Sequence, residues 1–132
     1  MALQFEQETY KIIGACMNVH KALGNGFLES VYQEALEKEL RKLQIPFVRH
    51  KKLTILFDGE LLDKFFVADF ACYDSIILEI KATTFLNQRD SDQVINYLKA
   101  TCLEVGLLVN FGESSLKWKR FINTQHKSVE SF

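Results

Sequence analysis

The sequence lacks the features that would distinguish it from an ordinary globular protein. It contains one proline and six glycines, and no apolar run approaches the ~20 residues of a membrane-spanning helix. Residues 1–6 lack a basic segment followed by an apolar one, so we expect no secretory signal and no membrane contact. Cys16, Cys72 and Cys102 form neither a CxxC pair nor a zinc-finger spacing, which predicts reduced, buried thiols in a cytoplasmic protein.

An excess of charge of one sign is also absent. The chain has 16 Lys+Arg against 17 Asp+Glu and a formal net charge of -1. This balance argues against a protein that holds nucleic acid by charge alone, so nucleic-acid contact would need local patches or a bound metal. The 132 residues, 48% of them hydrophobic, are enough to bury one core, which predicts a single domain over residues 1–132.

Apolar spacing predicts two helices at the start of the chain. The first covers residues 5–23 and stops at Gly24-Asn25-Gly26. The second begins after this turn and ends before Pro46, because the residue before a proline is biased out of helical geometry. If Gly26 is its N-cap, Glu29 takes the third helical position, where a glutamate closes a capping box. Glu29 therefore has a structural interpretation beside any functional one.

The rest of the chain alternates strands with one helix. A turn at Asp58-Gly59 and another at 73–75 predict a three-stranded meander, and Asp90 or Ser91 is the expected N-cap of the later helix. The predicted strands cover 47–48 with 53–57, 61–73, 76–81, 105–111 and 116–122, the helix covers 92–102, and a frayed polar tail covers 123–132. The order ααβββαβ(β) predicts an α/β fold with a mixed sheet flanked by helices.

Charged residues interrupt two strands that are otherwise apolar. Asp69 lies in Phe66–Cys72, and Glu79 and Lys81 lie two residues apart in the next strand, on one face of the sheet. Two carboxylates and an ammonium at neighbouring strand ends suit a hard cation and a water activated beside it. A structural ion pair at the end of the sheet is the alternative interpretation.

Three further polar residues have two interpretations each. Gln93 and Tyr97 lie at i, i+4 on the later helix, where they border the same site if that helix packs over the sheet. Otherwise Gln93 is a surface amide and Tyr97 an aromatic at the edge of the core. His20 lies on the inward arc of the first helix and is either a catalytic residue or a satisfied core histidine.

In this order, these residues resemble the GxxExxY family, a branch of the PD-(D/E)XK nuclease-like superfamily. The motif is present as Gly26-Phe27-Leu28-Glu29-Ser30-Val31-Tyr32, after Val19-His20-Lys21-Ala22-Leu23-Gly24. Asp69 and Glu79-Ile80-Lys81 are similar to the superfamily signature, with Ala68 where that signature has proline. The spacing of Gln93 and Tyr97 is similar to the Q-x-x-x-Y element of RecB-like nucleases. The resemblance implies a restriction-endonuclease-like core.

The resemblance also implies a mechanism. Asp69, Glu79 and the Ile80 carbonyl, with Glu29, would bind Mg²⁺ or Mn²⁺. Lys81 would position or deprotonate the attacking water in the hydrolysis of a phosphodiester, and Gln93 completes the catalytic set. His20, Tyr32 and Tyr97 would support it. The alternative is a nuclease-fold interaction or regulatory module that has lost catalysis.

Substrate contact is expected from two basic runs. The first supplies Arg49, Lys51 and Lys52, and the second supplies Lys117, Lys119 and Arg120 around Trp118, which could stack on a base. The substrate would be DNA or RNA. Since the chain is nearly all catalytic core, its specificity would need a homodimer, a protein partner or a structure-selective groove.

Overall fold

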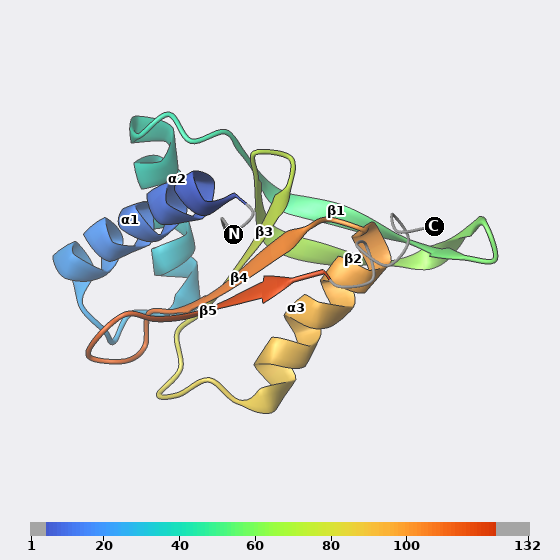
Figure 1. Cartoon of the computed structure of the whole chain (residues 1–132). Coiled ribbons are helices and arrows are strands. Elements are labelled where there is room, and N and C mark those ends of the chain that lie inside the picture. Colours follow the sequence, from blue (N-terminus) through green and yellow to red (C-terminus); the bar gives the residue numbers. More distant parts are fainter. Residues whose placement is uncertain (1–4, 124–132) are drawn as a thin grey trace.

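The computed structural model describes residues 5–123, which form a five-stranded sheet with helices on both faces (Figure 1). The strand order is β1-β2-β3-β4-β5; β3 and β4 run parallel, and the other neighbouring strands run antiparallel. The elements are α1 (Glu6–Leu23), α2 (Glu29–Lys42), β1 (Phe47–Phe57), β2 (Glu60–Cys72), β3 (Ile76–Lys81), α3 (Gln88–Thr101), β4 (Val105–Asn110) and β5 (Lys117–Ile122). The predicted mixed α/β fold is confirmed, and the last strand is present.

Two apolar clusters form the core, one on each face of the sheet. Helices α1 and α2 cover one face, where Tyr32 and Leu36 pack against Leu78 and Ile80. Helix α3 covers the other face through Val94 and Leu98 (Figure 1). All six residues of β4 are buried, as expected for a strand between two layers of helix.

The first two strands form a hairpin longer than the rest of the sheet. Asp58 and Gly59 both have positive φ, 53° and 79°, as a two-residue hairpin turn requires. Strand β3 pairs with β2 only from Phe70 to Cys72, so the outer part of the hairpin has no third strand beside it. In Figure 1 it projects beyond the rest of the sheet.

Several predicted details are wrong. Helix α3 begins at Gln88, and its N-cap is Asn87 in a capping box with Asp90, because the Asn87 side chain reaches the Asp90 backbone N–H. Helix α2 begins at Glu29 itself, so the glutamate does not occupy the third helical position and closes no capping box. Cys102 follows α3 in a left-handed conformation and is exposed, unlike the buried Cys16 and Cys72.

Two other expectations concern the ends and the membrane. The predicted frayed tail falls, after Asn123, outside the described residues. Among residues 5–123, no helix is long and apolar enough to cross a membrane.

Candidate active site

Strands β2 and β3 separate at Asp69 and Glu79, and these two carboxylates bridge the gap. The regular pairing ends with Phe70 opposite Leu78. Beyond it, the Asp69 backbone N–H donates to Glu79 Oε1 over 2.8 Å, and the Ile80 N–H donates to Asp69 Oδ2 over 2.8 Å. Each carboxylate therefore takes a backbone hydrogen bond from the other strand and is fixed in position.

Helix α2 adds two polar side chains to this pair. Gln33 Nε2 donates to Asp69 Oδ1 over 3.1 Å and to Glu29 Oε2 over 3.3 Å. Glu29 and Gln33 are one helical turn apart, so a single face of α2 presents both. Gln33 is buried. Gln33 was not predicted as a site residue. Its i+4 spacing from Glu29 is the sequence feature that could have indicated it.

The acidic side chains lie in a poorly solvated environment. Burial raises the pKa of the Glu79 carboxyl to about 8, and the nearby Asp69 adds to this rise, while Lys81 opposes it. Burial and then Asp69 also raise the pKa of Glu29, again against the effect of Lys81. A raised carboxyl pKa means that the ionised form is destabilised at this place. A bound cation would reduce that destabilisation.

Helix α3 presents one face to the strand that carries Glu79 and Lys81. Asp90 Oδ1 lies 3.9 Å from Lys81 Nζ, an ion pair that was not predicted. Tyr97 is buried against Phe66, with ring centroids 4.7 Å apart. Burial raises the Tyr97 pKa to about 12, and the charge of Glu79 contributes. Gln93 is half-buried between Asp90 and Tyr97 on this helix face.

His20 and Tyr32 lie beside the loops that follow α1 and β4. The Tyr32 hydroxyl donates to the Gly24 carbonyl, and the ring stacks on Phe111 with centroids 4.8 Å apart. His20 Nε2 lies 2.9 Å from the Glu113 carbonyl oxygen and is buried. Their contacts are thus with the loops rather than with Asp69 or Glu79, as expected for a core histidine.

Asn110 ends the buried strand β4 and was not predicted. Its Oδ1 accepts hydrogen bonds from the backbone N–H groups of Thr83 and Gly112, both over 3.0 Å. Its Nδ2 donates to the Thr83 carbonyl over 3.0 Å and to Glu113 Oε2 over 2.8 Å. The segment that follows Lys81 is therefore fastened to β4. The available signal was a single polar residue at the end of an apolar parallel strand.

The first basic run has mixed surroundings. Arg49 pairs with Glu37 over 2.6 Å, and its other terminal nitrogen donates to Gln33 Oε1 over 3.3 Å. Lys51 and Lys52 are exposed, and the Lys52 ammonium lies 4.4 Å from the Phe65 ring centroid. Of the predicted contacts in this run, the two lysines are exposed and Arg49 is half-buried.

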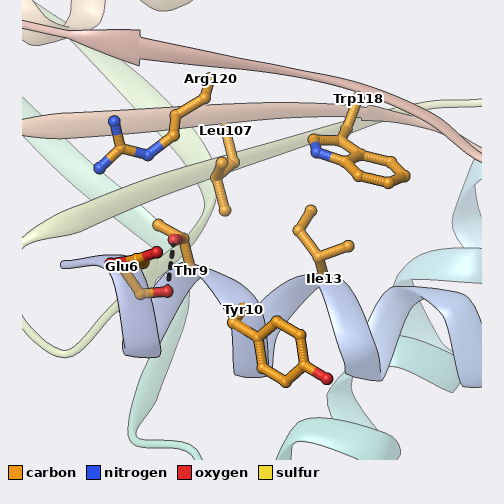
Figure 2. A pocket seen from close by; sticks show the side chains of 7 residues that line it. All are labelled: Glu6, Thr9, Tyr10, Ile13, Leu107, Trp118 and Arg120. Carbon is orange, nitrogen blue, oxygen red and sulfur yellow. Dashed lines mark hydrogen bonds between the residues drawn. The ribbon is translucent and has the colours of Figure 1, made fainter. Parts of the chain in front are cut away.

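The second basic run is divided between the two faces of β5. Trp118 and Arg120 pair with Val109 and Leu107, on the side of the sheet that α1 covers. They line a cavity of about 220 Å³ against α1 (Figure 2), whose walls are Glu6, Thr9, Tyr10, Ile13, Leu107, Trp118 and Arg120. Lys117 and Lys119 are exposed and alternate with them. Arg120 therefore shares a face of the sheet with Trp118, whereas Lys117 and Lys119 lie on the other face.

Lys117 is nevertheless in line with the acidic site. It pairs with Asn110 across β4 and β5, and Asn110 pairs with Lys81 across β3 and β4. Paired residues share a face of the sheet, so Lys81, Asn110 and Lys117 form one row at this end of the sheet.

Residues 6–121 match the PD-(D/E)XK nuclease superfamily. The chain belongs to the PD-(D/E)XK nuclease superfamily. A solved structure titled "Crystal structure of SSO0001" has a similar fold, with a TM-score of 0.55 and 16% sequence identity over 97% of this chain and 67% of that one. No curated protein matches the sequence. The sheet and its helices are thus the restriction-endonuclease-like core that this superfamily implies.

PD-(D/E)XK nucleases generally use divalent metal ions. Within residues 5–123, no three His, Cys, Asp or Glu side chains are grouped closely enough to form a ready-made metal site. The donor chemistry nevertheless fits a hard cation, because the half-buried Glu29 and the buried Glu79 place carboxylate oxygens near Asp69, and the pKa values of both carboxyl groups are raised. Asp69 and Glu79 are held together by hydrogen bonds rather than dispersed.

Proposed function

We propose that this superfamily member hydrolyses phosphodiester bonds in DNA or RNA with Mg²⁺ or Mn²⁺ as cofactor. The observation that carries the proposal is the pair of hydrogen bonds where β2 and β3 separate: Glu79 accepts from the Asp69 N–H, and Asp69 accepts from the Ile80 N–H. Lys81 follows on the same strand and face as Glu79. A purely structural ion pair would not require a second buried carboxylate, which burial and Asp69 make costly.

The proposed metal ligands are Asp69, Glu79 and the Ile80 carbonyl, with Glu29 from α2. When bound, the ion would lower the pKa of a coordinated water and neutralise charge on the phosphate. Gln33 keeps Asp69 and Glu29 at a fixed separation through its two hydrogen bonds. The protein thus supplies oxygen ligands whose positions are set before the substrate arrives.

Lys81 is the proposed group that orients or deprotonates the attacking water and stabilises the developing negative charge. Asp90, 3.9 Å from its ammonium, restricts where Lys81 points. Gln93 and Tyr97 share the face of α3 that carries Asp90, and we assign them to water or phosphate positioning and to substrate contact.

Lys117 is the basic residue best placed to contact a phosphate near this site, because it shares a row with Lys81 and Asn110. Lys119 and Arg120 continue the same strand, while Lys51 and Lys52 lie on the long hairpin. Arg49 is the least suitable of the predicted contacts, since Glu37 already pairs with it.

Within the superfamily, we assign the chain to the GxxExxY branch. The motif has a physical basis in this fold. Gly26 has φ 124°, a conformation that other residues rarely adopt. Tyr32 fastens the turn through hydrogen bonds with Gly24 and Phe27, and Glu29 points its carboxylate at Gln33 beside Asp69. These three positions support the assignment.

The decisive test titrates Mg²⁺ and Mn²⁺ with single- and double-stranded DNA and RNA. Wild type is compared with Asp69→Ala and Lys81→Ala, and with Glu34→Gln, an exposed acid on α2, as the matched control. We expect cleavage by wild type and control only. If no substrate is cleaved and no divalent ion binds, the nuclease proposal fails and the interaction module replaces it. Activity that survives Asp69→Ala would indicate a contaminant or another catalytic site.

A further inference from the structure

The outer part of the β1–β2 hairpin, residues 51–68, carries an unusual amount of exposed apolar surface; we call it the arm. Its exposed large apolar side chains are between 43% and 66% exposed. They are Leu56, Phe57, Leu61, Leu62, Phe65 and Val67. None of them belongs to the proposed catalytic machinery, and an isolated two-stranded ribbon does not need them for its own pairing.

Helix α3 covers only one side of the arm. Leu53, Phe66 and Ala68 pack against it, next to Tyr97. Phe65 and Val67 alternate with these residues along β2 and therefore lie on the opposite, uncovered side. The outer strand is also an open sheet edge, and its Leu53–Phe57 segment contains no charge. Natural proteins normally protect such an edge with charge or cover it.

Charge is distributed unevenly along the arm. Lys51 and Lys52 lie at its base, whereas Asp58, Glu60 and Asp63 lie at or near its tip. Lys64 lies between these two groups, and the net charge of the arm is zero. If two arms lie side by side in opposite directions, the acidic tip of each meets the basic base of the other. A two-fold axis produces this arrangement, because each partner then presents the same surface.

We propose that the arm is the dimerisation element of this protein and that its occupant is the arm of a second copy, packed antiparallel through the uncovered apolar side. By the alternation along the two paired strands, four of these side chains lie on the uncovered side, namely Leu56, Leu61, Phe65 and Val67, and they supply on the order of 400 Å² per partner. The lysine stems add to this area, which places the dimer toward the small end of protein–protein interfaces, where ~800 Å² per partner is standard. A nucleic acid fits the arm less well, because the tip is acidic and the arm has no net positive charge.

The test is the molar mass of the full chain by sedimentation velocity and light scattering, over about a hundredfold range of concentration, without metal or nucleic acid. We expect a dimer for wild type and a monomer for Leu61→Lys/Phe65→Lys. Both residues are exposed, so the fold should survive, which circular dichroism checks. Tyr10→Lys, at a large side chain on α1 that is even more exposed, is the control and should remain dimeric. A wild type that is monomeric throughout, or a double variant that stays dimeric, overturns the proposal.

Charge reversal tests the antiparallel arrangement. Lys51→Glu/Lys52→Glu should weaken the dimer at least tenfold, since acid then faces acid, and adding Asp58→Lys/Glu60→Lys should restore it. Restoration supports opposed arms, and an undiminished dimer in Lys51→Glu/Lys52→Glu contradicts them. If wild type is monomeric and these lysine variants instead lose nucleic-acid binding, the arm is a nucleic-acid surface and the dimer proposal is wrong. Molar mass does not depend on catalysis, so this result is independent of the proposed nuclease activity.

Discussion

The backbone N–H of Asp69 donates a 2.8 Å hydrogen bond to Glu79 Oε1 where regular pairing between β2 and β3 has ended. In return, Asp69 Oδ2 accepts from the N–H of Ile80, the residue after Glu79. The two carboxylates replace the hydrogen bonds that a longer strand pair would have made. The backbone N–H groups therefore stay hydrogen-bonded although the strands separate. The same arrangement gathers acidic oxygens at one place, as the proposed metal site requires.

Gln33 should control how well this site binds metal. Gln33→Ala removes the amide that holds Asp69 Oδ1 and Glu29 Oε2. We expect Mn²⁺ affinity, measured by isothermal titration calorimetry, to fall on the order of tenfold or more, as for other residues that orient metal ligands. Unfolding free energy should fall by only about 1 kcal/mol.

The control for this prediction is Gln7→Ala, which removes an exposed glutamine from α1. It should leave both quantities unchanged. If Gln33→Ala loses stability but keeps the wild-type Mn²⁺ affinity, Gln33 has a structural role alone.

Glu79 should make stability depend on pH. Its pKa is about 8 in the folded protein against a usual 4.5, so the folded state holds a proton that the unfolded state releases. The resulting stability is complete below about pH 4.5 and is lost as the pH rises through about 8, by an amount on the order of 5 kcal/mol. Urea unfolding of the metal-free protein between pH 5 and 9 measures this loss.

Glu79→Gln removes the titrating carboxyl and should flatten this pH dependence. At pH 8.5 the variant should be more stable than metal-free wild type, yet inactive as a nuclease. Added Mn²⁺ should stabilise wild type most at high pH, where Glu79 is ionised, and should stabilise the variant little. Equal pH dependence in wild type and Glu79→Gln would show that another group is responsible.

The sequence predicted the strand residues of the site better than the helical ones. Asp69 and Glu79 interrupt apolar strands, so burial made them conspicuous. Gln33 does not stand out in this way, because a glutamine on a helix is usually exposed to solvent. Only the folded structure brings its amide to Asp69. Capping by Glu29 was a wrong prediction because Phe27 and Leu28 remain outside the helix, which therefore begins two residues later than expected.

The other site residues that the sequence did not predict depend on contacts between distant parts of the chain. Asn110 lies 27 residues from Thr83, whose backbone it binds, and no local pattern relates them. Asp90 was considered only as a cap, and its distance to Lys81 depends on how α3 crosses the sheet. The mixed sheet itself was predictable, since the buried run of β4 and the meander before it are local features.

Asp90 should influence Lys81 independently of its role in the capping box. Asp90→Asn keeps an oxygen that can accept from the Asn87 N–H but removes the charge 3.9 Å from Lys81. We expect kcat to fall about tenfold with KM nearly unchanged, because Lys81 loses its orientation. Asn87→Ala instead removes the cap, which should cost about 1 kcal/mol of stability and little activity. The interpretation is contradicted if both variants lower kcat in proportion to their loss of stability.

Asn110 should be the polar residue whose loss costs most stability. It is fully buried, and Asn110→Leu leaves the N–H groups of Thr83 and Gly112 and the Thr83 carbonyl without their partner. The expected loss, from urea unfolding, is about 3 kcal/mol, since each of these three partly buried groups loses a hydrogen bond that contributes on the order of 1 kcal/mol.

Asn110→Asp separates the acceptor role of this side chain from its donor role. An aspartate still accepts from Thr83 and Gly112 but no longer donates to Glu113, whose carboxylate it then repels. Its stability should lie between wild type and Asn110→Leu, and the Asp variant should be most stable at low pH, where that repulsion is relieved. Asn25→Ala, at an exposed position, serves as control. Since Thr83 is two residues from Lys81, nuclease activity should decline in the same order, from wild type through Asn110→Asp to Asn110→Leu. Unchanged activity in Asn110→Leu would show that the site does not need the segment after Lys81 to be fixed to β4.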